Sequence, residues 1–136
     1  MKKAFLDTNI FIRYLTNDDP QKADRVEALL NDAAGGRIRL VTADIILAEI
    51  VWVLESFYKL KRHEIAEKIK AITHTPGLIV LSKVDLNRVV DDYVLYKIDF
   101  IDALMVNMMD YHGIDTVYSF DRKHLNRMTR VTRLEP

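Results

Sequence analysis

The chain has 136 residues, of which 49% are hydrophobic and 29% are charged, a composition typical of a folded globular protein and not of a disordered one. Twenty Lys and Arg residues balance twenty Asp and Glu residues, so the net charge does not indicate a polyanionic partner. With no cysteine, the sequence excludes disulfides, thiolate metal sites and a cysteine nucleophile.

The hydropathy of the chain predicts a cytoplasmic protein that does not enter a membrane. No apolar run is long enough to span a bilayer, and the N-terminus reaches Asp7 too soon to supply the apolar region of a signal peptide. The sequence contains no repeat, low-complexity segment or flexible linker. We therefore expect one domain over residues 1–136.

Short apolar runs alternate with amphipathic segments along the chain. The Asp19-Pro20 pair is typical of a helix N-cap followed by proline, and Gly35-Gly36 of a helix end. The expected elements, in chain order, are strand 3–6, helix 9–15, helix 20–34, strand 37–41, helix 43–57, helix 63–73, strand 78–81, helices 85–96 and 101–111, strand 116–120 and a last strand near 131–134.

This alternation favours an α/β fold, a three-layer α/β/α sandwich around a mostly parallel central sheet. In such sheets, ligands bind beyond the carboxyl ends of the strands. Asp7 and Asp121 each follow a predicted strand directly, which is the first indication of a shared site. Each also has a simpler interpretation, Asp7 as a helix cap and Asp121 as a turn residue in a salt bridge.

Glu49 lies inside a long apolar helix. Its neighbours three and four residues away are Ile45, Ile46, Trp52 and Val53. This spacing predicts a carboxylate on the stripe that faces the core, which is costly unless the carboxylate is paired or bound to metal. The alternative is an acid at the edge of that stripe, reaching toward water.

Asp102 repeats this pattern in a later helix. Its neighbours at the same spacings are Ile98, Asp99, Met105 and Val106, so its only polar neighbour is another acid. Repulsion between the two carboxylates would be relieved by a bound cation. Asp99 precedes the helix and is expected to cap it or to face water, and its role is left open.

Two acids at strand ends and two on helices suggest binding of a hard cation. Mg²⁺ and Mn²⁺ prefer oxygen ligands, and such ions can hold a phosphodiester and activate water. The segment 121–133 carries Arg122, Lys123 and Arg127, which could contact phosphates or form an exposed basic face. The four histidines (His63, His74, His112, His124) lie in polar or helix-terminal contexts and are expected at the surface.

Four segments, in this order, resemble the PIN-domain family, and within it the VapC-type ribonuclease toxins of toxin–antitoxin pairs. They are "FLDTNIFIRYL", "LAEIVWVL", "DFIDALMVNMMDYHG" and "VYSFDRKHLNRM", and the resemblance covers essentially the whole chain. It implies an acidic quartet of Asp7, Glu49, Asp102 and Asp121 that binds Mg²⁺ or Mn²⁺ and catalyses hydrolysis of RNA.

The resemblance implies further residues and partners. Thr8, Asn9 and Ser119 match small polar positions that would support the acids by hydrogen bonds. Arg122, Lys123 and Arg127 would hold the RNA backbone. Toxins of this type form homodimers and are inhibited by a cognate antitoxin protein. The alternative is a non-catalytic RNA- or protein-binding module on the same fold, because fold does not determine function.

Overall fold

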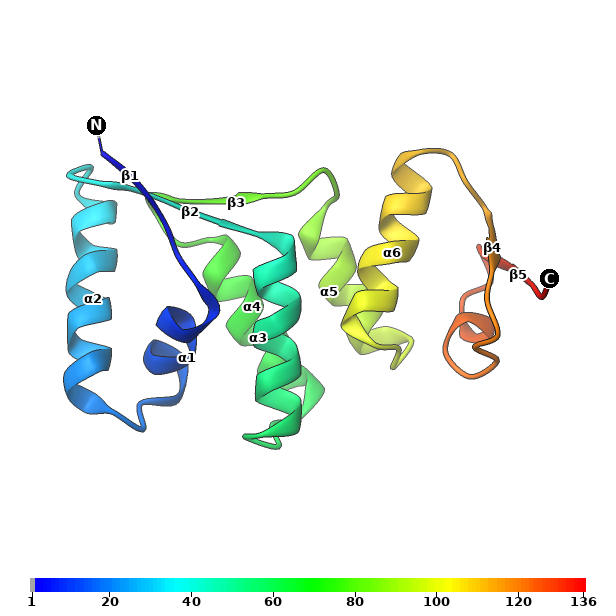
Figure 1. The fold of residues 1–136 in the computed structure, drawn as a ribbon, viewed down its shortest axis with the longest axis horizontal. Helices are drawn as coiled ribbons and strands as arrows, with labels where there is room; N and C mark the ends of the chain where they lie inside the picture. The colour runs from blue at the N-terminus through cyan, green and yellow to red at the C-terminus, as the bar shows by residue number, and fades with distance from the viewer. Residues whose placement is uncertain (1) are drawn as a thin grey trace. The chain divides into compact units, whose positions relative to one another are not determined.

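The computed structural model describes residues 2–136 and divides into two compact units (Figure 1). The N-terminal unit ends at Ser82, and the C-terminal unit runs from Lys83 to Pro136. The single domain expected over residues 1–136 stays a prediction. Within residues 2–136, none of the helices combines the length and apolar character needed to cross a membrane.

The N-terminal unit contains three strands and four helices within the described residues. They are β1 (Lys3–Phe5), α1 (Thr8–Thr16), α2 (Pro20–Ala34), β2 (Arg39–Ala43), α3 (Asp44–Ser56), α4 (Arg62–Thr73) and β3 (Leu78–Leu81). The predicted cap of α2 is confirmed, because the Asp19 side chain accepts a hydrogen bond from the backbone nitrogen of Lys22 at 3.2 Å.

The three strands form one sheet in the order β1-β2-β3, and both pairs are parallel. Leu40 of the central strand pairs with Ala4 on one side and Leu78 on the other, and it is fully buried. Thr42 extends the first pairing by donating a hydrogen bond from Oγ1 to the carbonyl of Leu6 at 3.2 Å. The predicted α/β class with parallel strands is confirmed, and the strands end at one common edge.

The second strand lies two residues later than the sequence predicted. Residues 37–41 were the expected range, whereas β2 is Arg39–Ala43. Arg37 is held back toward α2, because its backbone nitrogen donates to the carbonyl of Asp32 and its Nε to the Asp32 carboxylate, at 3.0 and 2.9 Å. Pairing with β1 therefore begins only at Arg39.

The C-terminal unit contains two helices, a short 3-10 helix and two strands within the described residues. They are α5 (Leu86–Leu95), α6 (Phe100–Tyr111), β4 (Thr116–Tyr118), η1 (Leu125–Arg127) and β5 (Thr132–Leu134). Strands β4 and β5 pair in parallel, with Val117 opposite Arg133. Tyr93 and Phe100 meet edge to face in the core, with ring centroids 5.7 Å apart.

A buried polar network ties the C-terminal segment to α5 and α6. Asp92 is 5% exposed, and its Oδ2 accepts hydrogen bonds from Asn107 Nδ2 at 2.8 Å and from the Arg130 guanidinium at 2.6 Å. Arg130 also donates from Nε to Asp110 at 2.8 Å. The hydrogen bond and charge of Asp92 raise the pKa of Arg130, so the guanidinium stays charged.

Gly77 is predicted to tolerate no side chain. Its φ is +78°, and an added Cβ would collide with the backbone carbonyl of Ala33. Gly77→Ala should lower the free energy of unfolding by about 3 kcal/mol, because the strain of a positive φ adds to a backbone clash. Gly36→Ala is the control: its φ is +77° with no atom near the added Cβ, so it should cost only about 1 kcal/mol. Equal losses for the two variants in chemical denaturation would contradict the clash.

Arg130→Ala should destabilise the protein by about 3–5 kcal/mol, because it leaves the buried Asp92 carboxylate without its cation. Chemical denaturation would measure the loss. Arg122→Ala serves as the control, since the pair between Arg122 and Glu135 is exposed and worth less than about 1 kcal/mol. A loss for Arg130→Ala no larger than the control's would show that the network adds little stability.

Candidate active-site carboxylates

Asp7 and Glu49 are joined by Thr8 in the N-terminal unit. Asp7 is the N-cap of α1, and its Oδ1 accepts a hydrogen bond from the backbone nitrogen of Thr8 at 2.7 Å. The hydroxyl of Thr8 donates to Oε2 of Glu49 at 2.7 Å. Thr8 is 5% exposed, so the residue that bonds Asp7 through its backbone and Glu49 through its side chain is itself buried.

These three residues line a pocket of about 420 Å³ formed by α1, α3 and the loops beside them. Asp18 also lines it, and the sequence did not single out this acid. Tyr58 donates a hydrogen bond from its hydroxyl to Asp18 at 2.6 Å, and Arg13 lies 3.4 Å from the same carboxylate. The Tyr58 hydroxyl is the main cause that lowers the pKa of Asp18 below its usual value.

The prediction that Glu49 lies on the core-facing stripe of its helix is wrong. Helix α3 buries Leu47, Ile50, Val51 and Leu54, while Glu49 is exposed. Its neighbours Ile45 and Trp52 are 68% and 66% exposed. The helix is apolar on several faces, so the neighbours of Glu49 did not identify the face that packs. Glu49 is held by Thr8 and not by the core.

Asp102 lies in the first turn of α6, next to His124. The imidazole Nδ1 of His124 is 3.3 Å from Asp102 Oδ2 and 3.4 Å from Asp99 Oδ2. One ligand atom from each of these three residues lies within 4.8 Å of the others. The expectation that His124 lies at the surface is wrong, because its side chain is only 17% exposed and packs against the two carboxylates. His63, His74 and His112 are exposed, as predicted.

Burial raises the pKa of Asp102 above its usual value. The hydrogen bond with His124 opposes this shift, and the nearby charges of Asp99 and Asp121 add to it. The protein alone therefore disfavours the ionised form of Asp102, and a bound cation would compensate that charge. The donor atoms of this cluster fit a divalent ion, since they are carboxylate oxygens with one imidazole nitrogen.

Asp121 closes the turn after β4. Its Oδ1 accepts hydrogen bonds from the backbone nitrogens of Lys123 and His124, at 2.8 and 3.2 Å. These two hydrogen bonds lower the pKa of Asp121 below its usual value. Ser119 Oγ accepts from the backbone nitrogen of Asp121 at 3.0 Å. The turn thereby positions Asp121 and, through the same backbone, His124 beside Asp102.

The three basic residues proposed to hold RNA differ in their surroundings. Lys123 is exposed, and Arg122 is exposed with its guanidinium 2.9 Å from Glu135. Arg127 donates from Nη1 to the carbonyl of Lys97 at 2.6 Å, so part of its guanidinium is already used within the protein.

The candidate residues thus fall into two groups, one in each unit. Asp7, Thr8 and Glu49 lie together in the N-terminal unit, where Asn9 lines the same pocket. Asp102 and Asp121 lie near His124 in the C-terminal unit. Asp18, Tyr58 and His124 were not predicted as site residues, because only folding brings them to these carboxylates.

Comparison with known proteins identifies the family. A family model described as PIN domain matches residues 4–131. A VapC ribonuclease from Aquifex aeolicus (strain VF5) is 25% identical over 118 residues, which is 87% of this chain and 87% of that protein.

Among solved structures, this chain is similar to one chain in the crystal structure of VapBC2 from Rickettsia felis bound to a DNA fragment from the VapBC2 promoter. The alignment covers 99% of this chain and 98% of the Rickettsia felis chain. Its sequence identity is 16% and its TM-score 0.38. The family model, by contrast, spans nearly the whole sequence and agrees with the resemblance inferred from the motifs. The chain belongs to the PIN-domain family.

Proposed function

We propose that this protein is a divalent-metal-dependent endoribonuclease and the toxin of a VapBC-type toxin–antitoxin pair. The observation that carries the proposal is the pair of carboxylates, Asp7 and Glu49, held by one buried threonine at a shared pocket in a PIN-family chain. A relative named VapC ribonuclease supports the activity. We infer that Asp102 and Asp121 are required for the same reaction.

The residues present fit a hard divalent cation. Asp7 and Glu49 offer only carboxylate oxygens, which are the ligands that Mg²⁺ and Mn²⁺ prefer. Asp102 has a raised pKa that a cation would relieve. When bound, the ion would polarise the phosphodiester and make water a better nucleophile.

The protein's own groups would orient the reactants. Thr8 fixes Oε2 of Glu49, and among residues 2–136 Oε1 has no hydrogen bond, so Oε1 would accept one from the attacking water. The backbone nitrogens of Lys123 and His124 fix one oxygen of Asp121 in the same way, and Ser119 accepts a hydrogen bond from the Asp121 backbone nitrogen. Arg122 and Lys123 are exposed and would contact the RNA backbone by charge.

The proposal includes two protein partners, which follow from the resemblance of the motifs to VapC-type toxins. One is a cognate antitoxin protein that inhibits the nuclease, and the other is a second copy of this chain in a homodimer. The α3 face around Ile45 and Trp52 is apolar and exposed, as surfaces that bind proteins often are.

Asp7→Asn should lower RNA cleavage at least about a hundredfold, because the variant loses a charged oxygen ligand but keeps the shape of the side chain. Its amide oxygen can still cap α1, so the fold should persist. Cleavage would be followed on transfer RNA and on structured ribosomal RNA fragments with Mn²⁺ or Mg²⁺, beside an EDTA control.

Asp24→Asn is the matched control, because it makes the same chemical change at an exposed position of α2. It should cleave at the wild-type rate. An Asp7→Asn protein that cleaves as fast as this control would refute the proposed mechanism. Absence of cleavage and of metal binding in the wild type would favour the non-catalytic binding module.

Metal binding should be visible as a rise in thermal stability. At an Mn²⁺ concentration about a hundred times the dissociation constant, the folded state should gain about 2.7 kcal/mol. In the Asp102→Asn variant, Mn²⁺ should raise the stability much less than in the wild type. In EDTA the variant should be as stable as the wild type, since the substitution removes a charge that burial already disfavours. Asp115→Asn, an exposed control in the same unit, should keep the whole gain. An equal rise for both variants would remove Asp102 from the metal site.

A further inference from the structure

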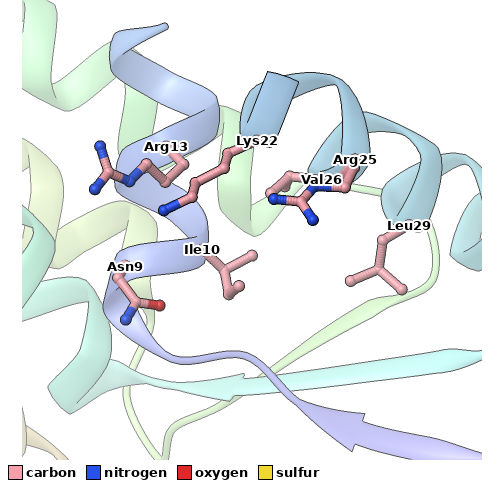
Figure 2. Close-up of a pocket in the computed structure, with 7 residues that line it drawn as sticks. All are labelled: Asn9, Ile10, Arg13, Lys22, Arg25, Val26 and Leu29. Atoms are coloured by element: carbon pink, nitrogen blue, oxygen red, sulfur yellow. The ribbon is translucent and has the colours of Figure 1, made fainter. Parts of the chain in front are cut away.

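A second pocket of the N-terminal unit lies between α1 and α2 (Figure 2). Its volume is about 480 Å³. Helix α2 contributes two cations, Lys22 and Arg25, and α1 contributes Arg13. Among the described residues, no acid lines this pocket. Its charge is therefore positive, in contrast to the carboxylate pocket beside it.

The cations of this pocket are weakly compensated within the protein. Arg25 has no ion pair or hydrogen bond of its side chain among residues 2–136. Lys22 lies 3.9 Å from Asp19, and Arg13 lies 3.4 Å from Asp18, both in half-exposed pairs. Such pairs are worth little in water, so all three cations are available to an anion.

The remaining surface of the pocket is apolar. Ile10, Val26 and Leu29 line it between the two helices, as Figure 2 shows. A free inorganic anion would make no favourable contact with this apolar surface. A nucleotide would contact both parts of the pocket, because its base has an apolar face and its phosphate carries negative charge.

This basic pocket borders the carboxylate pocket. Asn9 and Arg13 line both of them, one turn apart on α1. A strand whose phosphate lies at Asp7 and Glu49 would therefore meet Arg13 next, and then the basic pocket. The neighbouring positions and the positive charge suit a polyanion that binds across both pockets.

We propose that the pocket between α1 and α2 is a nucleotide subsite that holds single-stranded RNA beside the carboxylates. Arg13, Lys22 and Arg25 bind the backbone phosphate, and the base lies against Ile10, Val26 and Leu29. This inference rests on the proposed ribonuclease function and deepens it. It adds an RNA contact on the N-terminal unit to those expected at Arg122 and Lys123.

An acidic protein segment is the rival occupant, and the structure favours RNA over it. The pocket shares its wall with a candidate centre for phosphodiester chemistry, so a nucleic-acid strand reaches both with one binding mode. The bases of RNA would also lie against the apolar lining of Ile10, Val26 and Leu29, which the carboxylates of an acidic segment would not use.

The test measures binding of a labelled single-stranded RNA of mixed sequence in EDTA, so that cleavage does not interfere. Arg25→Ala should weaken binding several-fold and reduce the slope of log affinity against log salt by about 0.7, the value for one lost phosphate contact. Arg25→Lys should keep most of the affinity. Lys68→Ala, which removes one charge from α4 outside both pockets, should match the wild type.

Unfolding would not explain a loss, because Arg25 is exposed and makes no ion pair among residues 2–136, and thermal melts of the variants would verify this. Equal affinity and equal salt slope for Arg25→Ala and Lys68→Ala would overturn the inference. So would a result in which Arg25→Ala binds RNA normally but loses binding to an oligoglutamate peptide.

A cleavage assay with Mn²⁺ on structured RNA separates this inference from the proposed function. If the wild type cleaves and Arg25→Ala binds and cleaves equally well, only the nucleotide subsite is refuted. If the wild type neither binds nor cleaves any of the RNAs, the ribonuclease proposal fails and the subsite with it. If the wild type cleaves and Arg25→Ala has the predicted defect in binding, both stand.

Discussion

Parallel pairing of β1 with β2 and β3 determines where the chemistry of the N-terminal unit can lie. Because the three strands run in one direction, the residues that follow them come together at one edge of the sheet. Asp7 follows β1 there, and Asp44 begins the helix after β2, where its carboxylate accepts a hydrogen bond from Ser82 after β3 at 2.9 Å. The sheet thus assembles polar groups from three distant segments, and α1 and α3 begin at that same edge.

The two groups of carboxylates are stabilised in different ways. In the N-terminal unit, Thr8 donates to both Asp7 and Glu49, and neither acid lies deep in the core. In the C-terminal unit, Asp102 is partly buried and close to other acids, with His124 as its nearest hydrogen-bonding group. In the second group, burial and the neighbouring acids raise the pKa of Asp102, and a cation there would offset both effects. The buried pair of Asp92 and Arg130 keeps the segment that carries His124 attached to α5 and α6.

The sequence predicted the elements well, because caps, glycines and apolar runs mark their ends. It also placed Asp7 at the end of β1, since a single acid after a strand is a local signal. The sequence could not predict which face of α3 is buried, because apolar residues lie around most of that helix. Only packing decides that Leu47 and Leu54 are buried and Glu49 is not. His124 and Asp18 could not be assigned either, since their partners Asp102 and Tyr58 lie 22 and 40 residues away in the chain.

The hydrogen bonds of Thr8 also make the two oxygens of each carboxylate different. Asp7 uses Oδ1 to cap α1, and Glu49 uses Oε2 to accept from the hydroxyl, so among residues 2–136 each retains one oxygen without a hydrogen bond. Coordination by one oxygen per carboxylate suits a small ion that keeps several waters in an octahedral shell. Calcium prefers more ligands and often takes both oxygens of a carboxylate. In the proposed site, Thr8 would thereby favour an ion that takes one oxygen from each carboxylate, although Thr8 itself contacts no metal.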